Sequence, residues 1–170
     1  MASANAGLRS SASKSFFTSA PTTDSAAPST TLVLQGVYLK DCSFEAPQGP
    51  RSNGEWNPQI SLDLNTNVQP IGGDLREVVL TVTVSAKQGD LTLFLVEVKQ
   101  AGAFRMQNLS TEEFKRAGGS ICPSVLFPYA RAVVSQLVSQ GGFPQLLLPP
   151  VNFDALYANS QTEAASATKN

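Results

Sequence analysis

The strongest constraint on the fold of this chain is a strand–turn–strand pattern near its middle. Residues Glu77–Ala86 are rich in valine and threonine, which favour β-strands. The segment Lys87–Asp90 then supplies turn residues, including Gly89 for a positive φ angle. Leu91–Gln100 returns as a second strand, so the pattern predicts an antiparallel hairpin.

Both faces of the return strand are predicted to be apolar. Alternate side chains fall into two sets, namely Leu93 and Leu95 with Glu97, and Phe94 with Val96 and Val98. One face would pack on a helix, whereas the other needs a cover that a chain of 170 residues has little left to provide. We therefore expect another copy of the chain to provide that cover in an oligomer.

Two further strands are predicted before the hairpin. The first runs from Leu32 toward Pro47, and the second spans Gln59–Asn65. In the second strand apolar side chains alternate with polar ones, which places on one face Ile60, Leu62 and Leu64. After the hairpin the period changes to that of helices, so the chain is predicted to be an α+β protein.

Three helices are predicted in the second half of the chain. They span Thr111–Ala117, Pro123–Ser139 and Asn152–Asn159. Ser110 or Thr111 would cap the first helix, and Asn152 would cap the last. The glycine pairs Gly118–Gly119 and Gly141–Gly142 are expected to end the first and second helices.

Composition excludes several classes of function. The net charge is −1 and the basic residues are scattered, so nothing favours nucleic acid as a partner. The chain has no histidine, which removes the commonest general base and metal ligand. Cys42 and Cys122 form no CxxC pair, and no GxxxxGK[ST] phosphate loop is present. We therefore predict no catalytic residue, no metal and no cofactor. The longest apolar runs are also too short to span a bilayer.

The two ends of the chain differ from its centre. Residues 1–31 contain thirteen serine or threonine and seven alanine residues, so this leader is predicted to be disordered. The leader lacks the apolar stretch of a secretory signal, and it is either an inert bacterial tail or an organellar transit peptide. The remainder divides into a folded domain, residues 32–160, and a disordered tail, residues 161–170. Two lone cysteines without a secretory signal favour a reducing, cytosol-like compartment, or an organelle matrix if the leader is a transit peptide.

Seven co-linear segments carry a family resemblance. They are Tyr38-x-Lys-Asp-x-Ser-Phe-Glu-Ala-Pro47, Trp56-x-Pro58, Glu77-Val-Val-Leu80, Glu97-Val98, Cys122-Pro-x-x-Leu-Phe-Pro-Tyr-Ala-Arg131, Gly142-Phe-Pro144 and Pro150-Val-Asn-Phe-Asp-Ala-Leu156. Together they resemble the SecB family of bacterial protein-export chaperones. The resemblance implies a four-stranded antiparallel sheet with helices packed on one side, assembled as a homotetramer that is a dimer of dimers. It also implies an ATP-independent holdase that keeps unfolded precursor proteins competent for translocation.

The resemblance further implies two binding surfaces. A flat face would dock the zinc-bearing C-terminal tail of the SecA ATPase through Asp41, Ser43, Glu45, Leu95 and Glu97. A groove for unfolded clients would be built from Phe44, Trp56, Ile60, Leu62, Leu64, Phe153, Leu156 and Tyr157. Each set has a structural alternative. The first could be a solvated edge of the sheet, and the second could be ordinary core, with the last helix acting either as core or as a lid.

Three other functions stay open on the sequence. A SecB-like chaperone could serve a single partner outside export, although such a protein need not keep the acidic residues Asp41, Glu45 and Glu97. Cys122 could be an enzyme nucleophile, because a thiol that precedes a helix can have a lowered pKa. The sheet could also hold a fixed pocket for a small ligand.

Overall fold

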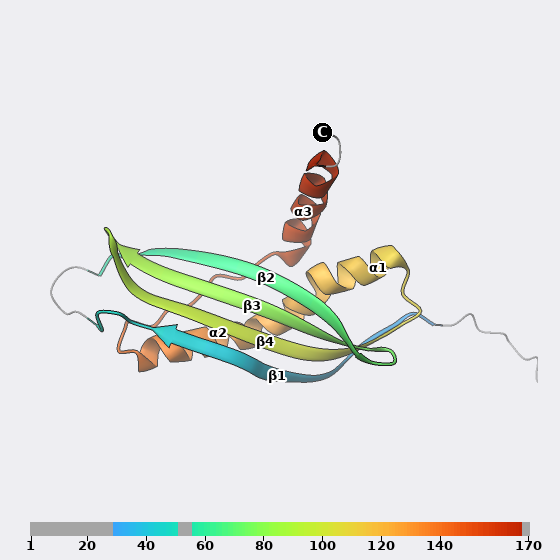
Figure 1. Cartoon of the computed structure of the whole chain (residues 1–170), viewed down its shortest axis with the longest axis horizontal. Coiled ribbons are helices and arrows are strands. Elements are labelled where there is room, and N and C mark those ends of the chain that lie inside the picture. The colour runs from blue at the N-terminus through green and yellow to red at the C-terminus, as the bar shows by residue number, and fades with distance from the viewer. Residues whose placement is uncertain (1–28, 51–55, 168–170) are drawn as a thin grey trace, which may run out of the picture.

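A computed structural model describes residues 29–50 and 56–167 of the chain. It contains one four-stranded sheet and a set of helices (Figure 1). The strands are β1 (Thr31–Glu45), β2 (Gln59–Gly72), β3 (Leu75–Gln88) and β4 (Leu91–Gln107), in the spatial order β1-β4-β3-β2 with every neighbouring pair antiparallel. The predicted fold class is thus confirmed, and each strand but the first is several residues longer than its sequence pattern indicated.

The predicted hairpin is present as β3 and β4. Gly89 has a φ angle of 60°, the left-handed conformation for which glycine was expected in this turn. A second glycine turn, Gly72–Gly73, joins β2 to β3 with φ angles of 142° and 52°. It extends both strands beyond the limits that we drew at Asn65 and Glu77.

One face of the sheet is the core, and the opposite face is open. Val82, Val84 and Val96 are fully buried on the core face. The open face carries mainly polar side chains at neighbouring positions of the four strands, among them Asp63, Asn65, Thr81, Thr83 and Lys99. Leu93 is buried at a shift in the β3–β4 register, so Leu95 is left as an exposed apolar residue between polar ones. The prediction of two apolar faces is therefore wrong, and it cannot support an oligomer.

Exposed apolar side chains lie elsewhere. Strand β1, an edge of the sheet, exposes Val33, Leu34, Tyr38 and Leu39. In the helical segment that follows the sheet, Ile121, Val125 and Tyr129 are exposed. A second copy of the chain would therefore bury apolar surface on strand β1 or on this helical segment.

The first two predicted helices form one continuous rod across the core face (Figure 1). The rod comprises α1 (Thr111–Arg116), a π-helical turn η1 (Ala117–Ile121) and α2 (Cys122–Gln140). Of the two expected caps, Ser110 and Thr111, the structure has Ser110, which forms a capping box with Glu113. The prediction that Gly118–Gly119 ends the first helix is wrong. These glycines lie inside the rod, where β2 and the last helix approach too closely for a Cβ atom.

The rod is the main helical part of the core. Cys122, Leu126, Ala130, Val134 and Val138 are fully buried and recur at helical spacing, so one side of α2 packs on the sheet. By length and composition Thr111–Gln140 could cross a membrane, and 39% of its apolar window is buried inside the fold.

The last helix, α3 (Phe153–Ala167), stands out beside the β2 edge of the sheet (Figure 1). The amide of Ala155 donates to Asn152 Oδ1 over 3.0 Å, which confirms the predicted N-cap. The helix continues eight residues beyond Asn159, into the segment that the sequence assigned to a tail. Most of the leader, residues 1–28, lies outside the described residues.

Candidate functional site

A cavity of about 500 Å³ lies between strand β2 and helix α3. Five of the eight residues predicted for the client groove line it: Leu62, Leu64, Phe153, Leu156 and Tyr157. Because β2 alternates, Leu62 and Leu64 point to the same side as their buried partners Val84 and Val82. The two leucines are half-buried, and they form the floor of the cavity while α3 forms its wall.

The wall is partly core and partly accessible. Phe153 is 4% exposed and packs edge-on against Phe127 of α2, with ring centroids 5.7 Å apart. Leu156, one turn further along, is 46% exposed. Phe153 therefore anchors α3 to the body, whereas Leu156 offers apolar surface to a bound molecule. The last helix was expected to be either core or a lid, and the structure divides its residues: Phe153 is core, and Leu156 borders the cavity.

The other predicted groove residues do not line this cavity. Phe44 stacks on Phe94 at 6.0 Å, and Trp56 contacts Phe143 at 5.9 Å. Phe143 lies within 6.2 Å of all three other rings and is the centre of this aromatic cluster. The sequence signal for it was the Gly-Phe-Pro segment, which we quoted without assigning a role. Ile60 is exposed on β2 near the cluster and lines neither site.

The five residues predicted to bind SecA lie together on the open face. Strand pairing sets Glu45 beside Leu95 and Ser43 beside Glu97, and Asp41 follows on the same face of β1. A register shift at Lys40 leaves Asp41, Ser43 and Glu45 in phase with one another. Two neighbouring strands thus present carboxylates of Asp41, Glu45 and Glu97 to solvent.

Lys99 lies within this acidic set, and sequence reasoning missed it. Its ammonium group is 3.1 Å from carboxylate oxygens of both Asp41 and Glu97. The hydrogen bonds that Lys99 donates to Asp41 and, to a lesser extent, to Glu97 raise the pKa of Lys99 above its ordinary value. The face is therefore not uniformly negative: one lysine holds two carboxylates in place, while Glu45 has no ion pair among those that the structure gives. The sequence did carry a signal for Lys99. Alternate residues of a strand lie on the same face, so Lys99 is on the face of β4 that carries Leu95 and Glu97.

A second ionic cluster, which was not predicted, lies at the other end of the open face. Glu77 is 4% exposed and accepts hydrogen bonds from Tyr38 Oη at 2.9 Å, Lys40 Nζ at 2.7 Å and Gln69 Nε2 at 2.7 Å. The hydrogen bond from Lys40 lowers the pKa of Glu77 against the effect of burial, and those from Gln69 and Tyr38 act in the same direction. The cluster ties β1, β2 and β3 together, so it stabilises the sheet.

The Glu77→Gln variant is expected to lower the free energy of unfolding by about 1–3 kcal/mol, because a charged buried acceptor is replaced by an amide that faces other donors. The wild-type contribution is present above the unfolded pKa of glutamate and is lost as pH falls through the lowered folded pKa. Urea unfolding at one protein concentration, repeated at pH 7 and below pH 4, measures both effects. The difference in free energy of unfolding between wild type and Glu77→Gln should become smaller at low pH. A difference that does not change with pH would contradict the stabilising role of the ionised Glu77.

Cys122 is unsuited to act as a nucleophile. The thiol is fully buried at the start of α2, and desolvation raises its pKa to about 12. A thiol with that pKa is protonated at neutral pH, whereas a nucleophilic cysteine needs the thiolate. Cys122 is therefore part of the apolar core.

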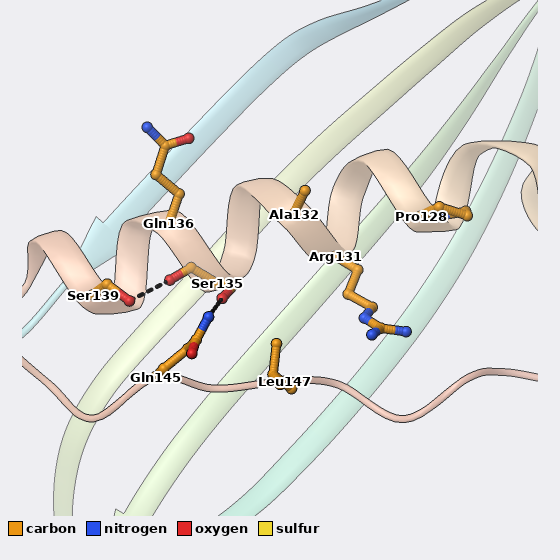
Figure 2. Close-up of a pocket in the computed structure, with 8 residues that line it drawn as sticks. All are labelled: Pro128, Arg131, Ala132, Ser135, Gln136, Ser139, Gln145 and Leu147. Atoms are coloured by element: carbon orange, nitrogen blue, oxygen red, sulfur yellow. Dashed lines mark hydrogen bonds between the residues drawn. The ribbon is translucent and has the colours of Figure 1, made fainter.

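A third region lies on the outer side of α2 (Figure 2). There a shallow cavity of about 660 Å³ is lined by α2 residues from Pro128 to Ser139 and by Gln145 and Leu147 of the following segment. Gln145 reaches Ser135 Oγ at 3.5 Å, which holds the segment beside the helix. Leu147 is 61% exposed, so this side of the molecule combines apolar and polar surface.

Comparison with known proteins gives consistent results. The family model for preprotein translocase subunit SecB matches residues 25–164. A protein-export protein SecB of Pseudomonas paraeruginosa is 54% identical over 127 residues, covering 74% of this chain and 78% of the relative. One from Nitrosococcus oceani is 50% identical over 137 residues, covering 79% of this chain and 84% of the relative.

A solved structure shares the fold. It is the SecB-like chaperone Rv1957 of Mycobacterium tuberculosis, in complex with a ChAD peptide from the Rv1956 HigA1 antitoxin. The TM-score is 0.59 at 14% sequence identity, and the match covers 71% of this chain and 91% of the other. At that identity the likeness shows the arrangement of strands and helices alone.

Proposed function

Because the chain belongs to the SecB family, we propose that it is an ATP-independent chaperone that holds unfolded precursor proteins and delivers them to the SecA motor of the export pathway. The observation that carries the proposal is the cavity between β2 and α3. Its accessible apolar residues Leu62, Leu64 and Leu156 come from a strand and a helix that stand side by side. An unfolded chain displays the apolar side chains that such a surface can bury.

The cavity suits clients of varied sequence. The cavity is open to solvent, and its lining combines apolar residues with polar ones such as Thr66 and Ser160. The charged residue that lines it, Asp63, is exposed rather than buried. Affinity then follows the apolar area that is covered, without a demand for one sequence. Binding the unfolded state lowers the free concentration of aggregation-prone chains by mass action, so no nucleotide is needed.

Capture of an unfolded protein tests this proposal directly. Reduced and carboxymethylated α-lactalbumin, which stays unfolded, is expected to bind without nucleotide, whereas native α-lactalbumin is not. Fluorescence anisotropy of the labelled probe measures both. Equal binding of the two forms, or binding that requires ATP, would contradict the proposed function.

The acidic set on the open face supports SecA as the receiving partner. Asp41, Glu45 and Glu97 would complement basic residues on the zinc-bearing tail of SecA and speed its association. The curated relatives are export proteins at about half identity over most of the chain, which favours this assignment over a chaperone dedicated to one other partner. The same family membership supports the bacterial cytoplasm as the location.

Assembly as a homotetramer is part of the proposal. Support comes from the rod, where Ile121 of η1 and Val125 and Tyr129 of α2 are exposed apolar side chains. A second copy of the chain would cover these side chains and leave the β2–α3 cavity open. Light scattering should give a mass near four times the 18.0 kDa of one chain. A monomer that stays stable across micromolar concentrations would contradict this assembly.

A further inference from the structure

The client cavity has a smaller neighbour with which it shares a wall. The second cavity, of about 280 Å³, lies between the end of β2, α1 and α3. Both cavities are lined by Thr66, Gly119 and Tyr157. The ring of Tyr157, which lies on the backbone of Gly119, thus divides one space along β2 into two.

This contact exists because residue 119 has no side chain. A Cβ atom at Gly119 would lie 2.5 Å from Tyr157 Cδ2 and 3.0 Å from Cε2, closer than carbon atoms approach. Gly119 is not among the described glycines that have a positive φ angle. A left-handed backbone conformation therefore does not explain why residue 119 is a glycine. The glycine is needed for the close approach of the ring.

The same π-helical turn holds α3 at a second point. Ser120 is 1% exposed, and its hydroxyl donates to Asp154 Oδ1 over 2.9 Å. Arg116, one turn earlier in the rod, reaches the same oxygen at 3.4 Å. Since α3 packs chiefly on η1, this turn determines where α3 stands relative to β2. Departures from regular α-helix of this kind are often found at functional sites.

We propose that Gly119 is a positioning residue for client binding: it seats Tyr157 so that the ring closes the end of the groove, and Ser120 holds the same helix through Asp154. The inference rests on the proposed function, because the groove is a client groove only if that function is right. Gly119 contributes no side chain to the groove. Through the position of Tyr157 it nevertheless sets the width of the groove and where the groove ends.

The Gly119→Ala variant should displace Tyr157 although alanine is the better helix former. Labelling with 3-fluorotyrosine gives three ¹⁹F resonances, from Tyr38, Tyr129 and Tyr157. The Tyr157 resonance, assigned from its loss in Tyr157→Phe, is expected to shift in Gly119→Ala and to stay in place in Gly118→Ala. The latter adds the same methyl group to the same turn, but toward Val68. An unmoved Tyr157 resonance in Gly119→Ala would overturn the inference.

A double-mutant cycle tests the effect on binding. Gly119→Ala is expected to weaken capture of carboxymethylated α-lactalbumin about tenfold, and to change it less than about twofold when Tyr157→Ala is also present, because the clash then has no partner. Equal weakening in both backgrounds would overturn the inference. If Gly119→Ala does not fold, the double variant should fold again, and failure to do so would count against it.

The two assays separate this inference from the function on which it rests. If the wild-type protein does not capture the unfolded probe, the proposed function fails, and the ¹⁹F spectra still decide whether Gly119 seats Tyr157.

Discussion

Replacing Asp41 and Glu45 with lysine is expected to abolish binding of the SecA tail and to leave capture of unfolded protein unchanged. The two carboxylates lie on one face of β1, on the opposite side of the sheet from the β2–α3 cavity. Reversal sets lysines against a basic partner and removes an ion pair from Lys99. Like charges at an interface cost several kcal/mol, so the affinity should fall by about 100-fold or more.

Titration calorimetry with a zinc-loaded SecA tail peptide measures this effect. The matched control carries Asp74→Lys and Glu112→Lys, two exposed acidic residues off the predicted surface that give the same change in net charge. The control should bind like the parent. Wild-type affinity should also decrease with added salt, because exposed pairs are screened over about 8–10 Å at physiological ionic strength. Equal affinity of the reversed and parent proteins would leave the five residues as a solvated face of the sheet.

Replacing Leu62 and Leu156 with serine is expected to weaken capture of unfolded protein by about 5-fold to 150-fold. These leucines come from opposite sides of the cavity, and both retain accessible surface. Loss of two apolar anchors at a binding surface costs about 1–3 kcal/mol, which corresponds to that range. The core should tolerate the change, because neither side chain is among the fully buried residues.

The control for this pair is Ile71→Ser with Leu91→Ser. Ile71 is 49% exposed and Leu91 is 44% exposed, and neither lines the cavity. Circular dichroism and light scattering show whether all variants keep the fold and assembly. If the folded Leu62→Ser, Leu156→Ser variant captures unfolded protein as well as the wild type, the two leucines have only a structural role. The single variant Trp56→Ala, measured in the same assay, shows whether the aromatic cluster around Phe143 contributes to capture of unfolded protein.

Local patterns in the sequence predicted most of the secondary structure. Alternating apolar residues identified the core side of β2, and Gly89 identified the β3–β4 turn. Ser110 and Asn152 were correctly placed as helix caps. These signals depend on residues within a few positions of one another, so the chain itself carries them.

Local sequence patterns gave a wrong prediction for the Gly118–Gly119 pair. Gly118–Gly119 has the composition of a helix end, yet the rod continues through it as a π-helical turn. The reason is non-local: Val68 and Tyr157 occupy the space where Cβ atoms would stand. A glycine that ends a helix and a glycine that admits a neighbour look alike in a sequence.

The sequence by itself determined the fold class, the element types and, through family resemblance, the two sets of candidate residues. The tertiary structure alone decided how those sets divide. It gathered five groove residues in one cavity, placed Phe44 and Trp56 around Phe143, and set Lys99 between two carboxylates. Asp41 and Lys99 are 58 positions apart, and they meet because strand register fixes their separation. Side-chain contacts depend on that register and on helix placement, which the packing of the whole core determines.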